Sequence, residues 1–416
     1  MRVLVLSHTF PFPPRWGYAT RVYHLLRQLA LRHDVTLLTY ADHGEQRGHQ
    51  LGLEGVRVEV VQRKESSRRA KRASQILSLV SVQPFSSRAV LSAEMQTAID
   101  RLCARQPFDV IQIEGAVLAA FKFPAKTAVV LDEHNIDYEV FERMRSSERS
   151  FPRRSFYWFE HDRFRRFEQR SWLRVSGCVL TSERDARILR AHAPETPTAV
   201  VPNGVDVHDF RPSSGGVEPH TILFNGALDY RPNLDAAHYL TDEILPAVRE
   251  RYPDVRLTIV GRGDPADLAR LKRAGAQVTG EVPDLRPHLQ RAAVVAVPVR
   301  MGGGTRFKVV EGLAMAKPMV STTIGCEGVD VIDGKHLLIA DTTGAFAAQI
   351  TRVFENALLA ETLGRAGRDL VENEYSWDRA GERIQDFYGH IARQRSAFNV
   401  ERSLAAVSAQ PAAHES

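Results

Sequence analysis

The segment of residues 302–323 has the residue types and spacing that most clearly indicate chemistry. It follows an apolar run, residues 292–299, that predicts a buried strand, and it continues into a run with helical periodicity. Its first part contains Gly302, Gly303, Gly304, Thr305, Arg306 and Lys308. A helix N-terminus presents unpaired N–H groups and a partial positive charge, and glycines let a bound group approach the backbone. Because two cations lie in the same short segment, it predicts an anion-binding site.

A carboxylate follows on the same predicted helix. Glu311 lies three residues after Lys308, which places both side chains on one helix face. A carboxylate beside a phosphate site is well suited to accept hydrogen bonds from sugar hydroxyls. Phosphate groups and a ribose together make up a nucleotide, so we interpret the segment as a nucleotide-binding site.

This segment resembles the donor-binding signature of GT-B glycosyltransferases, specifically the family-4-like group, or glycosyl transferases group 1. Two further segments resemble parts of that family: VVPNGVDVHDF, residues 200–210, its interdomain junction, and GCEGVDVIDGKHLLIAD, residues 325–341, its closing segment. The resemblance implies that Glu311 binds the nucleotide ribose. It also implies a nucleoside-diphosphate sugar, UDP- or GDP-linked, as co-substrate, with no separate cofactor.

One position departs from the family pattern. The first glutamate of the family's E-x7-E pair would stand at 303, where this chain has Gly303. In the family that glutamate contacts the transferred sugar. Either backbone amides of the glycine loop make this contact here, or the enzyme is impaired.

Length and periodicity predict the fold class. The chain has 416 residues, more than the roughly 250 to 300 at which single cores stop growing, so we expect two domains. Short Val, Ile and Leu runs alternate with amphipathic stretches, as in parallel sheets covered by helices. We predict an α/β protein with two Rossmann-like domains facing a cleft, the GT-B arrangement. The expected parts are residues 1–203 (acceptor-binding), 204–376 (nucleotide-sugar-binding), 377–395 (a helix returning to the first domain) and 396–416 (a disordered tail).

The individual strands are predicted from the same runs. In the first half we expect strands at residues 2–6, 34–39, 56–61, 109–113, 127–131, 177–181 and 198–201. In the second half we expect them at 220–224, 256–260, 294–299 and 319–321. Ligands of such sheets bind at the carboxyl ends of the strands.

The loop after the first strand argues against a dinucleotide-dependent oxidoreductase. That class would place GxGxxG directly after the strand. Here the loop reads SHTFPFPPRWGYATRV, with the single glycine Gly17 before a helix. The resemblance implies that Gly17 lies where backbone amides face the donor diphosphate and the acceptor. A simple turn or helix-entry glycine is the alternative.

A histidine follows a strand in the first domain. His134 lies in VVLDEHNIDYE, and the resemblance implies contact with the donor sugar or its phosphate. A neutral imidazole donates through one nitrogen and accepts through the other, so the residue type fits. A solvent-facing loop histidine is the alternative. Glu114 is a weaker candidate for contact with an acceptor hydroxyl, and a helix N-cap role fits it equally well.

The second domain opens with a departure from the family as well. Many relatives read G-R-L with a downstream lysine, whereas here Ala227 follows Gly226. The resemblance implies that Gly226 leaves room for the nucleotide, and we interpret Arg306 and Lys308 as replacing the missing cations. Arg231 is a candidate contact to the acceptor or a phosphate.

The expected reaction is sugar transfer to a hydroxyl of a glycan or lipid-linked acceptor, in cell-surface polysaccharide or glycolipid synthesis. Such a reaction builds negative charge on the leaving diphosphate, which Arg306, Lys308 and the helix N-terminus can stabilise. No DxD-like pair is present where a metal would be expected, so we predict metal independence, and the resemblance implies retention of configuration. We expect His134, Arg306 and Lys308 to be catalytic. A catalytically silent nucleotide-sugar-binding assembly subunit is the alternative, and a GT-B epimerase is a third reading.

Charge and composition bear on partners and location. The net charge of +5 is small for this length and no nucleic-acid reader module is recognisable, so we expect no nucleic acid. Three widely spaced cysteines and the lack of any apolar stretch of about 18 residues predict a reduced, cytoplasmic protein. Residues 143–174 hold ten arginines against four acids, interleaved with aromatic residues. They could form a basic amphipathic surface that contacts an anionic membrane, or the aromatics could pack beneath the cleft.

Overall fold

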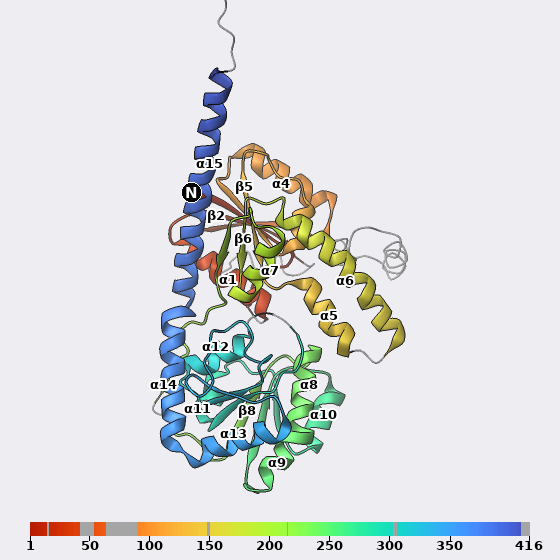
Figure 1. The fold of residues 1–416 in the computed structure, drawn as a ribbon, viewed down its shortest axis with the longest axis vertical. Coiled ribbons are helices and arrows are strands. Elements are labelled where there is room, and N and C mark those ends of the chain that lie inside the picture. The colour runs from red at the N-terminus through yellow and green to blue at the C-terminus, as the bar shows by residue number, and fades with distance from the viewer. Residues whose placement is uncertain are drawn as a thin grey trace, which may run out of the picture.

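The computed structural model describes residues 1–14, 16–41, 54–63, 90–147, 150–213, 215–302, 304 and 306–408. Two α/β units, each with a parallel sheet, lie one above the other in Figure 1. This confirms the predicted fold class. The predicted site residues Gly303 and Thr305, and residues 409–416 of the predicted tail, lie outside the described residues.

The first unit is built on a seven-stranded parallel sheet in the order β3-β2-β1-β4-β5-β6-β7. Its strands are β1 (Arg2–Ser7), β2 (Asp34–Ala41), β3 (Val56–Gln62), β4 (Val110–Glu114), β5 (Ala128–Glu133), β6 (Gly177–Leu180) and β7 (Thr198–Val200). The central strands β1 and β4 are almost wholly buried because helices cover both faces of the sheet, which explains their continuous apolar runs.

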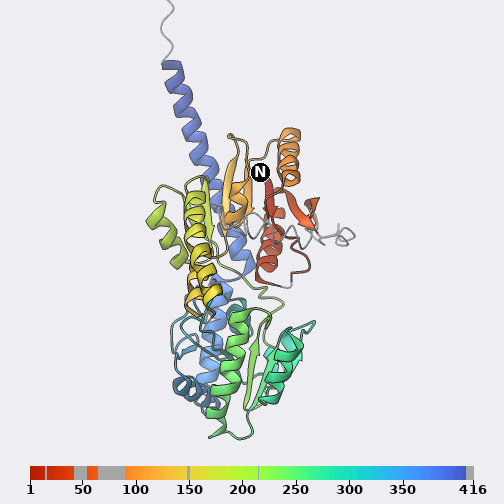
Figure 2. The same cartoon turned by 90° about the vertical axis from the view of Figure 1, so that its right-hand side faces the viewer.

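Helices cover this sheet on two sides. They are α1 (Gly17–Ala30), α4 (Ala93–Arg105), the 3-10 turn η2 (Ala116–Ala120), α5 (Asp137–Ser147), α6 (Phe151–Trp172) and α7 (Glu183–His192). Helix α1 lies on one face with the C-terminal helix α15 (Trp377–Ser408), and α4 and α7 lie on the other. Helices α5 and α6 pack together and project from the body, above the second unit, in Figures 1 and 2.

The second unit has a six-stranded parallel sheet in the order β10-β9-β8-β11-β12-β13. Its strands are β8 (Thr221–Asn225), β9 (Arg256–Val260), β10 (Gln277–Gly280), β11 (Val294–Val297), β12 (Met319–Ser321) and β13 (Leu338–Ile339). Its helices are α8 (Arg231–Tyr239), the π-turn η3 (Leu240–Ile244), α9 (Leu245–Arg249), α10 (Pro265–Arg273), α11 (Arg286–Arg291), α12 (Phe307–Ala314), α13 (Thr343–Glu355) and α14 (Ala357–Glu374). The sheet order reverses between β8 and β11, which is where doubly wound sheets bind ligands.

The chain crosses back to the first unit through its last two helices. Figure 1 shows α14 and α15 as one column along the left-hand side, from the lower unit to the upper. Tyr388 and Ile384 of α15 are buried with α1 in the core of the first unit. Helix α15 continues beyond the expected end at 395 to Ser408, over a stretch containing the helix formers Ala, Leu, Arg and Glu.

Each predicted strand overlaps an observed one, and two observed strands were not predicted. The short edge strands β10, with the polar sequence QVTG, and β13, with two residues, carry too little apolar periodicity to be recognised. Most of the predicted strands are buried, whereas β3 and β7, at the two edges of the first sheet, are mostly half-buried.

The aromatic residues of α6 divide into two groups. Phe164 and Trp172 are buried against the sheet, as the packing alternative expected. Phe156, Trp158 and Phe159 are 42, 53 and 49% exposed, nearer the start of the helix. The structure therefore fits the packing alternative at Phe164 and Trp172, whereas the exposed aromatic residues are available for the membrane-contact alternative.

Candidate active site

The glycine segment lies between β11 and α12, and its cations are held in an unusual environment. Arg306 precedes the first helical residue, and its Nε is buried with no hydrogen-bond partner among the described residues. Its Nη2 is 3.4 Å from the Met301 carbonyl oxygen, a weak contact. Burial lowers the pKa of Arg306. A guanidinium in this position is well placed to bind an anion.

Lys308 is buried more deeply, with 8% of the residue exposed. Its Nζ donates to Asn233 Oδ1 at 2.8 Å and lies 4.3 Å from the centre of the Phe224 ring. Burial, followed by the charge of Arg306, lowers the pKa of Lys308 to about 7, while Glu311 opposes the shift. A buried lysine with a neutral amide as its hydrogen-bond partner is stabilised strongly by an added negative group.

Glu311 lies one turn further along α12, and its Oε2 is 3.4 Å from Asn225 Nδ2 at the end of β8. Burial raises the pKa of Glu311 to about 7, although Lys308 opposes the shift. Gly226 follows Asn225 directly, and a Cβ there would lie 2.8 Å from Lys308 Nζ. The glycine therefore makes room for the lysine side chain, and the site sits at the carboxyl ends of β8 and β11.

The glycine loop is pressed against the first unit. Gly302 and Gly304 have φ angles of 101° and 76°, which only glycine adopts readily. A Cβ on Gly304 would lie 1.9 Å from Asn135 Oδ1, in the loop after β5. Arg143 of α5 donates a hydrogen bond to the Gly302 carbonyl oxygen. The loop is thus enclosed by both units.

Ion pairs hold the two units together beside this loop. Glu327, from the segment after β12, accepts hydrogen bonds from Arg143 at 2.6 and 2.9 Å. Arg184 of α7 lies 3.2 Å from the same carboxylate and also pairs with Glu139. Burial by itself would raise the pKa of Glu327, but the arginines lower it below its ordinary value. The carboxylate is therefore an interdomain anchor.

The opposite wall of the site is the end of β5 in the first unit. His134 is 13% exposed, and its Nε2 is 2.8 Å from Glu114 Oε2. Its ring stacks on Tyr18 of α1 with centroids 4.8 Å apart. Asp132 Oδ2 is 3.8 Å from the same nitrogen, but both Asp132 oxygens accept hydrogen bonds from Arg21, at 2.9 and 2.7 Å. His134 is therefore held by other side chains, unlike a mobile loop histidine.

Two predictions for the first unit change with the structure. Glu114 is fully buried, so the suggested contact with an acceptor hydroxyl is wrong, because no substrate can reach it. Gly17 is the first residue of α1, and a Cβ there would lie 3.2 Å from the Phe307 ring of α12. Its small size therefore serves close contact between the two units. Arg231 begins α8, close to the glycine loop.

The Glu114, Asp132 and His134 side chains lie close enough for a metal site, with one ligand atom of each within 4.8 Å of the others. Those atoms already have hydrogen-bond partners: Arg21 binds Asp132, and Glu114 binds both His134 and Gln112. The cluster is a hydrogen-bonded network.

Several residues at the site were missed by sequence reasoning. They are Asn225, Asn233, Asn135, Arg143, Arg184 and Glu327. Each meets the glycine segment only through the fold. Glu327 stands in the recognised segment GCEGVD, so that segment was the one available signal.

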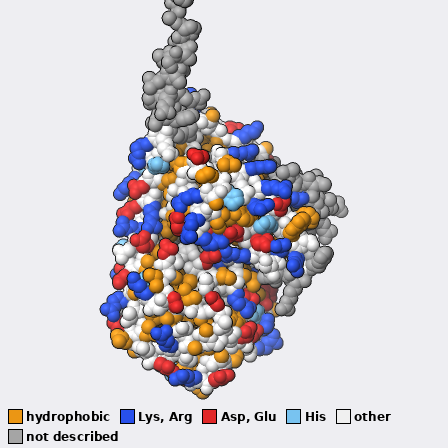
Figure 3. Space-filling view, viewed as in Figure 1, with side chains coloured by type: hydrophobic (Ala, Val, Ile, Leu, Met, Phe, Trp, Pro, Cys, Tyr) orange, Lys and Arg blue, Asp and Glu red, His pale blue; other side chains and the backbone are white. Residues whose placement is uncertain are grey.

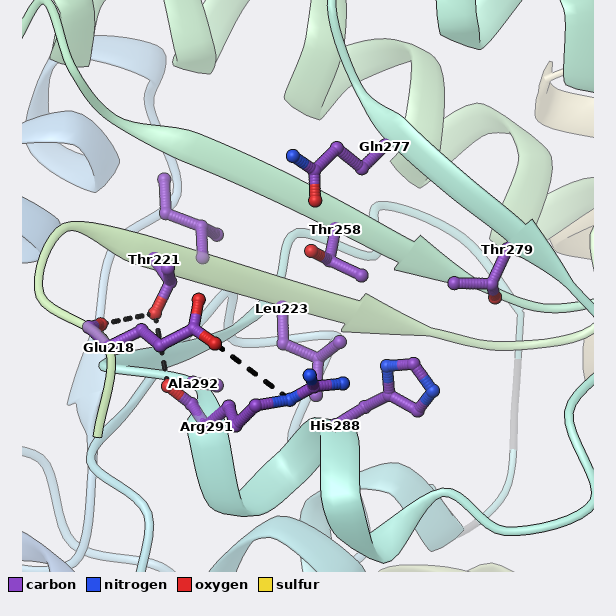
Figure 4. A pocket seen from close by; sticks show the side chains of 10 residues that line it. Glu218, Thr221, Leu223, Thr258, Gln277, Thr279, His288, Arg291 and Ala292 are labelled. Atoms are coloured by element: carbon purple, nitrogen blue, oxygen red, sulfur yellow. Dashed lines mark hydrogen bonds and ion pairs between the residues drawn. The ribbon is translucent and has the colours of Figure 1, made fainter. Parts of the chain in front are cut away.

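A second hollow lies elsewhere in the lower unit. Its volume is about 250 Å³. Figure 4 shows that it lies beside α11 and the strands β8, β9 and β10. The charged groups there are paired, since Glu218 lies 4.0 Å from Arg291 and 3.2 Å from Arg256. Because this hollow lacks an uncompensated charge of the kind seen at Lys308, we place the candidate site at the glycine loop.

Within the described residues, no helix is long and apolar enough to cross a membrane.

Comparison with known proteins agrees with the geometry. A family described as "Glycosyl transferase 4-like domain" matches residues 17–204, and one described as "Glycosyl transferases group 1" matches residues 219–356. Phosphatidyl-myo-inositol mannosyltransferase of Mycobacterium leprae is 30% identical over 213 residues, 48% of this chain and 55% of that protein. A GDP-mannose-dependent mannosyltransferase of Corynebacterium glutamicum, acting on a monoacylated phosphatidylinositol monomannoside, is 27% identical over 207 residues, 44% of this chain and 54% of that protein. The chain spans about half the length of these curated relatives.

Solved structures share the fold at low identity. HepE of Anabaena in complex with UDP has a TM-score of 0.69 at 15% identity, covering 94% of this chain and 100% of that one. Sucrose-phosphate synthase of Thermosynechococcus elongatus has a TM-score of 0.67 at 18% identity, covering 94% and 98%. Because the two family matches together span both units and the fold agrees throughout, the chain belongs to the group 1, family-4-like glycosyltransferases of GT-B fold.

Proposed function

We propose that the protein is a glycosyltransferase that moves a sugar from a nucleoside-diphosphate sugar to a hydroxyl of a glycan or lipid-linked acceptor, with retention of configuration and without a metal. The observation that carries the proposal is the pair of cations formed by half-buried Arg306 and buried Lys308, neither of which has a carboxylate ion-pair partner among the described residues. A diphosphate would neutralise both. Glu311, on the same helix, is placed to accept hydrogen bonds from a ribose.

The proposed mechanism depends on how the protein stabilises the negative charge of the leaving diphosphate. As the bond from the sugar to the diphosphate breaks, negative charge grows on the leaving phosphate oxygens. Arg306, Lys308 and the N–H groups at the start of α12 stabilise that charge, and the enclosing first unit excludes water. The leaving oxygen takes the proton of the acceptor hydroxyl, which attacks from the same face. His134, across the cleft, contacts the sugar or its phosphate.

Experiment must identify whether the donor nucleotide contains uridine or guanosine. Structures of HepE hold UDP or UDP-glucose, whereas the relative from Corynebacterium glutamicum is named as GDP-mannose-dependent. A thermal-shift screen of UDP, GDP and their sugars tests binding, since a ligand of the native state raises the melting temperature. Transfer is then followed by NMR of the product anomer, with and without a chelator. An inverted anomer or full loss of activity in chelator contradicts the retaining or metal-free part, and nucleotide binding without turnover favours the silent-subunit alternative.

We further propose that the acceptor is reached at an anionic lipid surface contacted by α6. Trp158 and Phe159 are half exposed and line a mostly apolar hollow together with Arg145 and Arg154. Figure 3 shows a group of hydrophobic side chains beside the grey atoms on the right, on the side where α6 lies in Figure 1, with Lys and Arg side chains nearby. Exposed aromatic rings beside arginines are suited to the interface of anionic lipid.

Vesicle flotation tests this second proposal. We expect the protein to float with phosphatidylglycerol vesicles at low salt but not with phosphatidylcholine vesicles. Replacing Trp158 and Phe159 by serine should reduce flotation about tenfold or more, because two large apolar side chains are lost. Leu358→Ser is the matched control, since Leu358 is 72% exposed on α14 of the other unit. Equal flotation of both variants, or none of the wild type, contradicts the proposal.

A further inference from the structure

A line of buried hydrogen bonds connects the C-terminal helix to His134. The Tyr388 hydroxyl of α15 donates to Gln112 Oε1 on β4. Gln112 Nε2 in turn donates to Glu114 Oε1 at 2.5 Å, and Glu114 Oε2 is 2.8 Å from His134 Nε2. Tyr388, Gln112 and Glu114 are all fully buried. The line therefore runs through the core from α15 to the wall of the cleft.

The donors and acceptors along this line fix one another. The tyrosine hydroxyl binds the amide oxygen of Gln112, so the amide nitrogen must face Glu114. An ionised carboxylate only accepts hydrogen bonds, and each Glu114 oxygen has one partner: the Gln112 amide and the His134 ring. Burial and Asp132 raise the pKa of Glu114, whereas the bonds from His134 and Gln112 favour its ionised form.

Neighbouring charges single out Glu114 as the partner of the imidazole. Asp132 is near, but Arg21 binds both of its oxygens, and Arg21 is itself fixed by the Val201 carbonyl oxygen and Asn203 Oδ1 at 2.9 and 3.1 Å. Stacking on Tyr18 fixes the plane of the His134 ring. The ring thus has one hydrogen-bonded edge, and its other edge has no hydrogen-bond partner in the part of the chain that the structure describes.

We infer that Glu114 is a positioning residue that holds His134 with a proton on Nε2, leaving Nδ1 free to meet the donor sugar or phosphate, and that Gln112 and Tyr388 fix Glu114 for this role. Nδ1 has no hydrogen-bond partner among the described residues. An imidazole held in one tautomer offers a defined acceptor at Nδ1, and a second proton there turns the same atom into a donor. The role at a sugar rests on the proposed function, but the tautomer does not.

NMR of protein labelled with 15N-histidine tests the tautomer directly in the protein without ligand. His134→Asn identifies the His134 signals by their loss. We expect the wild-type ring to carry a proton on Nε2, the nitrogen that faces Glu114. A wild-type His134 found with its only proton on Nδ1 overturns the inference whether or not the protein transfers sugar.

Variants test the cause. Glu114→Leu removes both acceptor oxygens and should mix the two tautomers. Glu114→Gln replaces one acceptor oxygen by an N–H donor, which then faces either Gln112 Nε2 or the His134 ring, so this variant should also lose the pure wild-type form. If transfer activity is found, we expect the leucine variant to lose tenfold or more in kcat with the KM for donor within about twofold. A His134 spectrum unchanged in the leucine variant overturns the inference.

The far end of the line has its own control. Tyr388→Phe removes only the hydroxyl that orients Gln112, and we expect it to shift the His134 ring signals. Gln28→Leu breaks a different contact between α1 and α15, the 2.8 Å bond from Gln28 to Asp378, and should leave those signals unchanged. A melting temperature raised normally by UDP or GDP shows that each variant is folded. Equal effects of the two variants contradict a specific line through Gln112.

Discussion

Replacing Lys308 by methionine is expected to stabilise the protein without ligand and to weaken its binding of a nucleoside diphosphate. Burial lowers the pKa of Lys308 from 10.5 to about 7. That difference of about 3.5 units, at roughly 1.4 kcal/mol each, corresponds to about 5 kcal/mol of destabilisation when the amine is charged. Methionine removes this charge at similar length. It leaves Asn233 Oδ1 without its donor, which costs about 1 kcal/mol, so we expect a net gain of about 2 to 4 kcal/mol.

The sign of the pH dependence follows from linkage. The pKa of Lys308 is lower in the folded than in the unfolded protein, so between pH 7 and 10.5 the unfolded chain binds the proton more strongly. The wild type should therefore become more stable as pH rises through this window. The advantage of the methionine variant should be full below pH 7 and vanish near pH 10.5.

Thermal unfolding at pH 6, 8 and 10, with and without UDP or GDP, measures both effects. Each kcal/mol corresponds to roughly 2 to 4 °C for a unit of this size. Loss of a charged hydrogen bond to the diphosphate, about 1.5 to 3 kcal/mol, should weaken nucleotide binding by roughly ten- to 150-fold.

Lys317 supplies the matched control. It is also buried, with its pKa lowered to about 8, but its Nζ donates to the Gln290 and Ala292 carbonyl oxygens at 2.6 and 3.0 Å. Lys317→Met leaves two buried carbonyls without that donor, so it should bring a smaller gain or a loss of stability, and an unchanged response to nucleotide. The reasoning is refuted if Lys308→Met destabilises the protein and leaves the nucleotide-induced shift intact.

Three other perturbations have defined outcomes. Burial raises the pKa of Glu311 to about 7, so wild-type stability should fall as pH rises from 4.5 to 7. Glu311→Gln should remove that fall. Calorimetry should show that the variant binds nucleoside diphosphate more weakly but binds pyrophosphate as the wild type does. Glu327→Gln weakens the ion pairs from Glu327 to Arg143 and Arg184 of the first unit, so small-angle scattering should show a larger radius of gyration. An unchanged radius would argue that Glu327 does not hold the two units together. Gly304→Ala places a Cβ 1.9 Å from Asn135 Oδ1 at a positive φ and should lower transfer at least tenfold; wild-type rates would show that the loop is not enclosed as described.

The sequence predicted the fold well because continuous apolar runs are typical of parallel strands buried on both faces. Those runs located β5, β8 and β11, whose carboxyl ends carry the walls of the site. Edge strand β10 was missed, since its four residues are half polar and largely outside the core.

The site was predicted only as far as one segment reaches. Arg306, Lys308 and Glu311 share a helix start, so their spacing alone indicated that they act together. Glu114 was misassigned, because a carboxylate at the end of a strand can face the cleft or the core, and here it is buried and bonded to Gln112 and His134. Glu327 could not be paired with Arg143 from the sequence, since only the packing of two units brings them together.

A structure of the protein in complex with UDP or GDP tests the central claim most directly. We predict that the diphosphate lies between the glycine loop and the N-terminus of α12, within hydrogen-bonding distance of Arg306 and Lys308, with Glu311 on the ribose. A nucleotide bound elsewhere, or bound here with both cations turned away from its phosphates, would contradict the account.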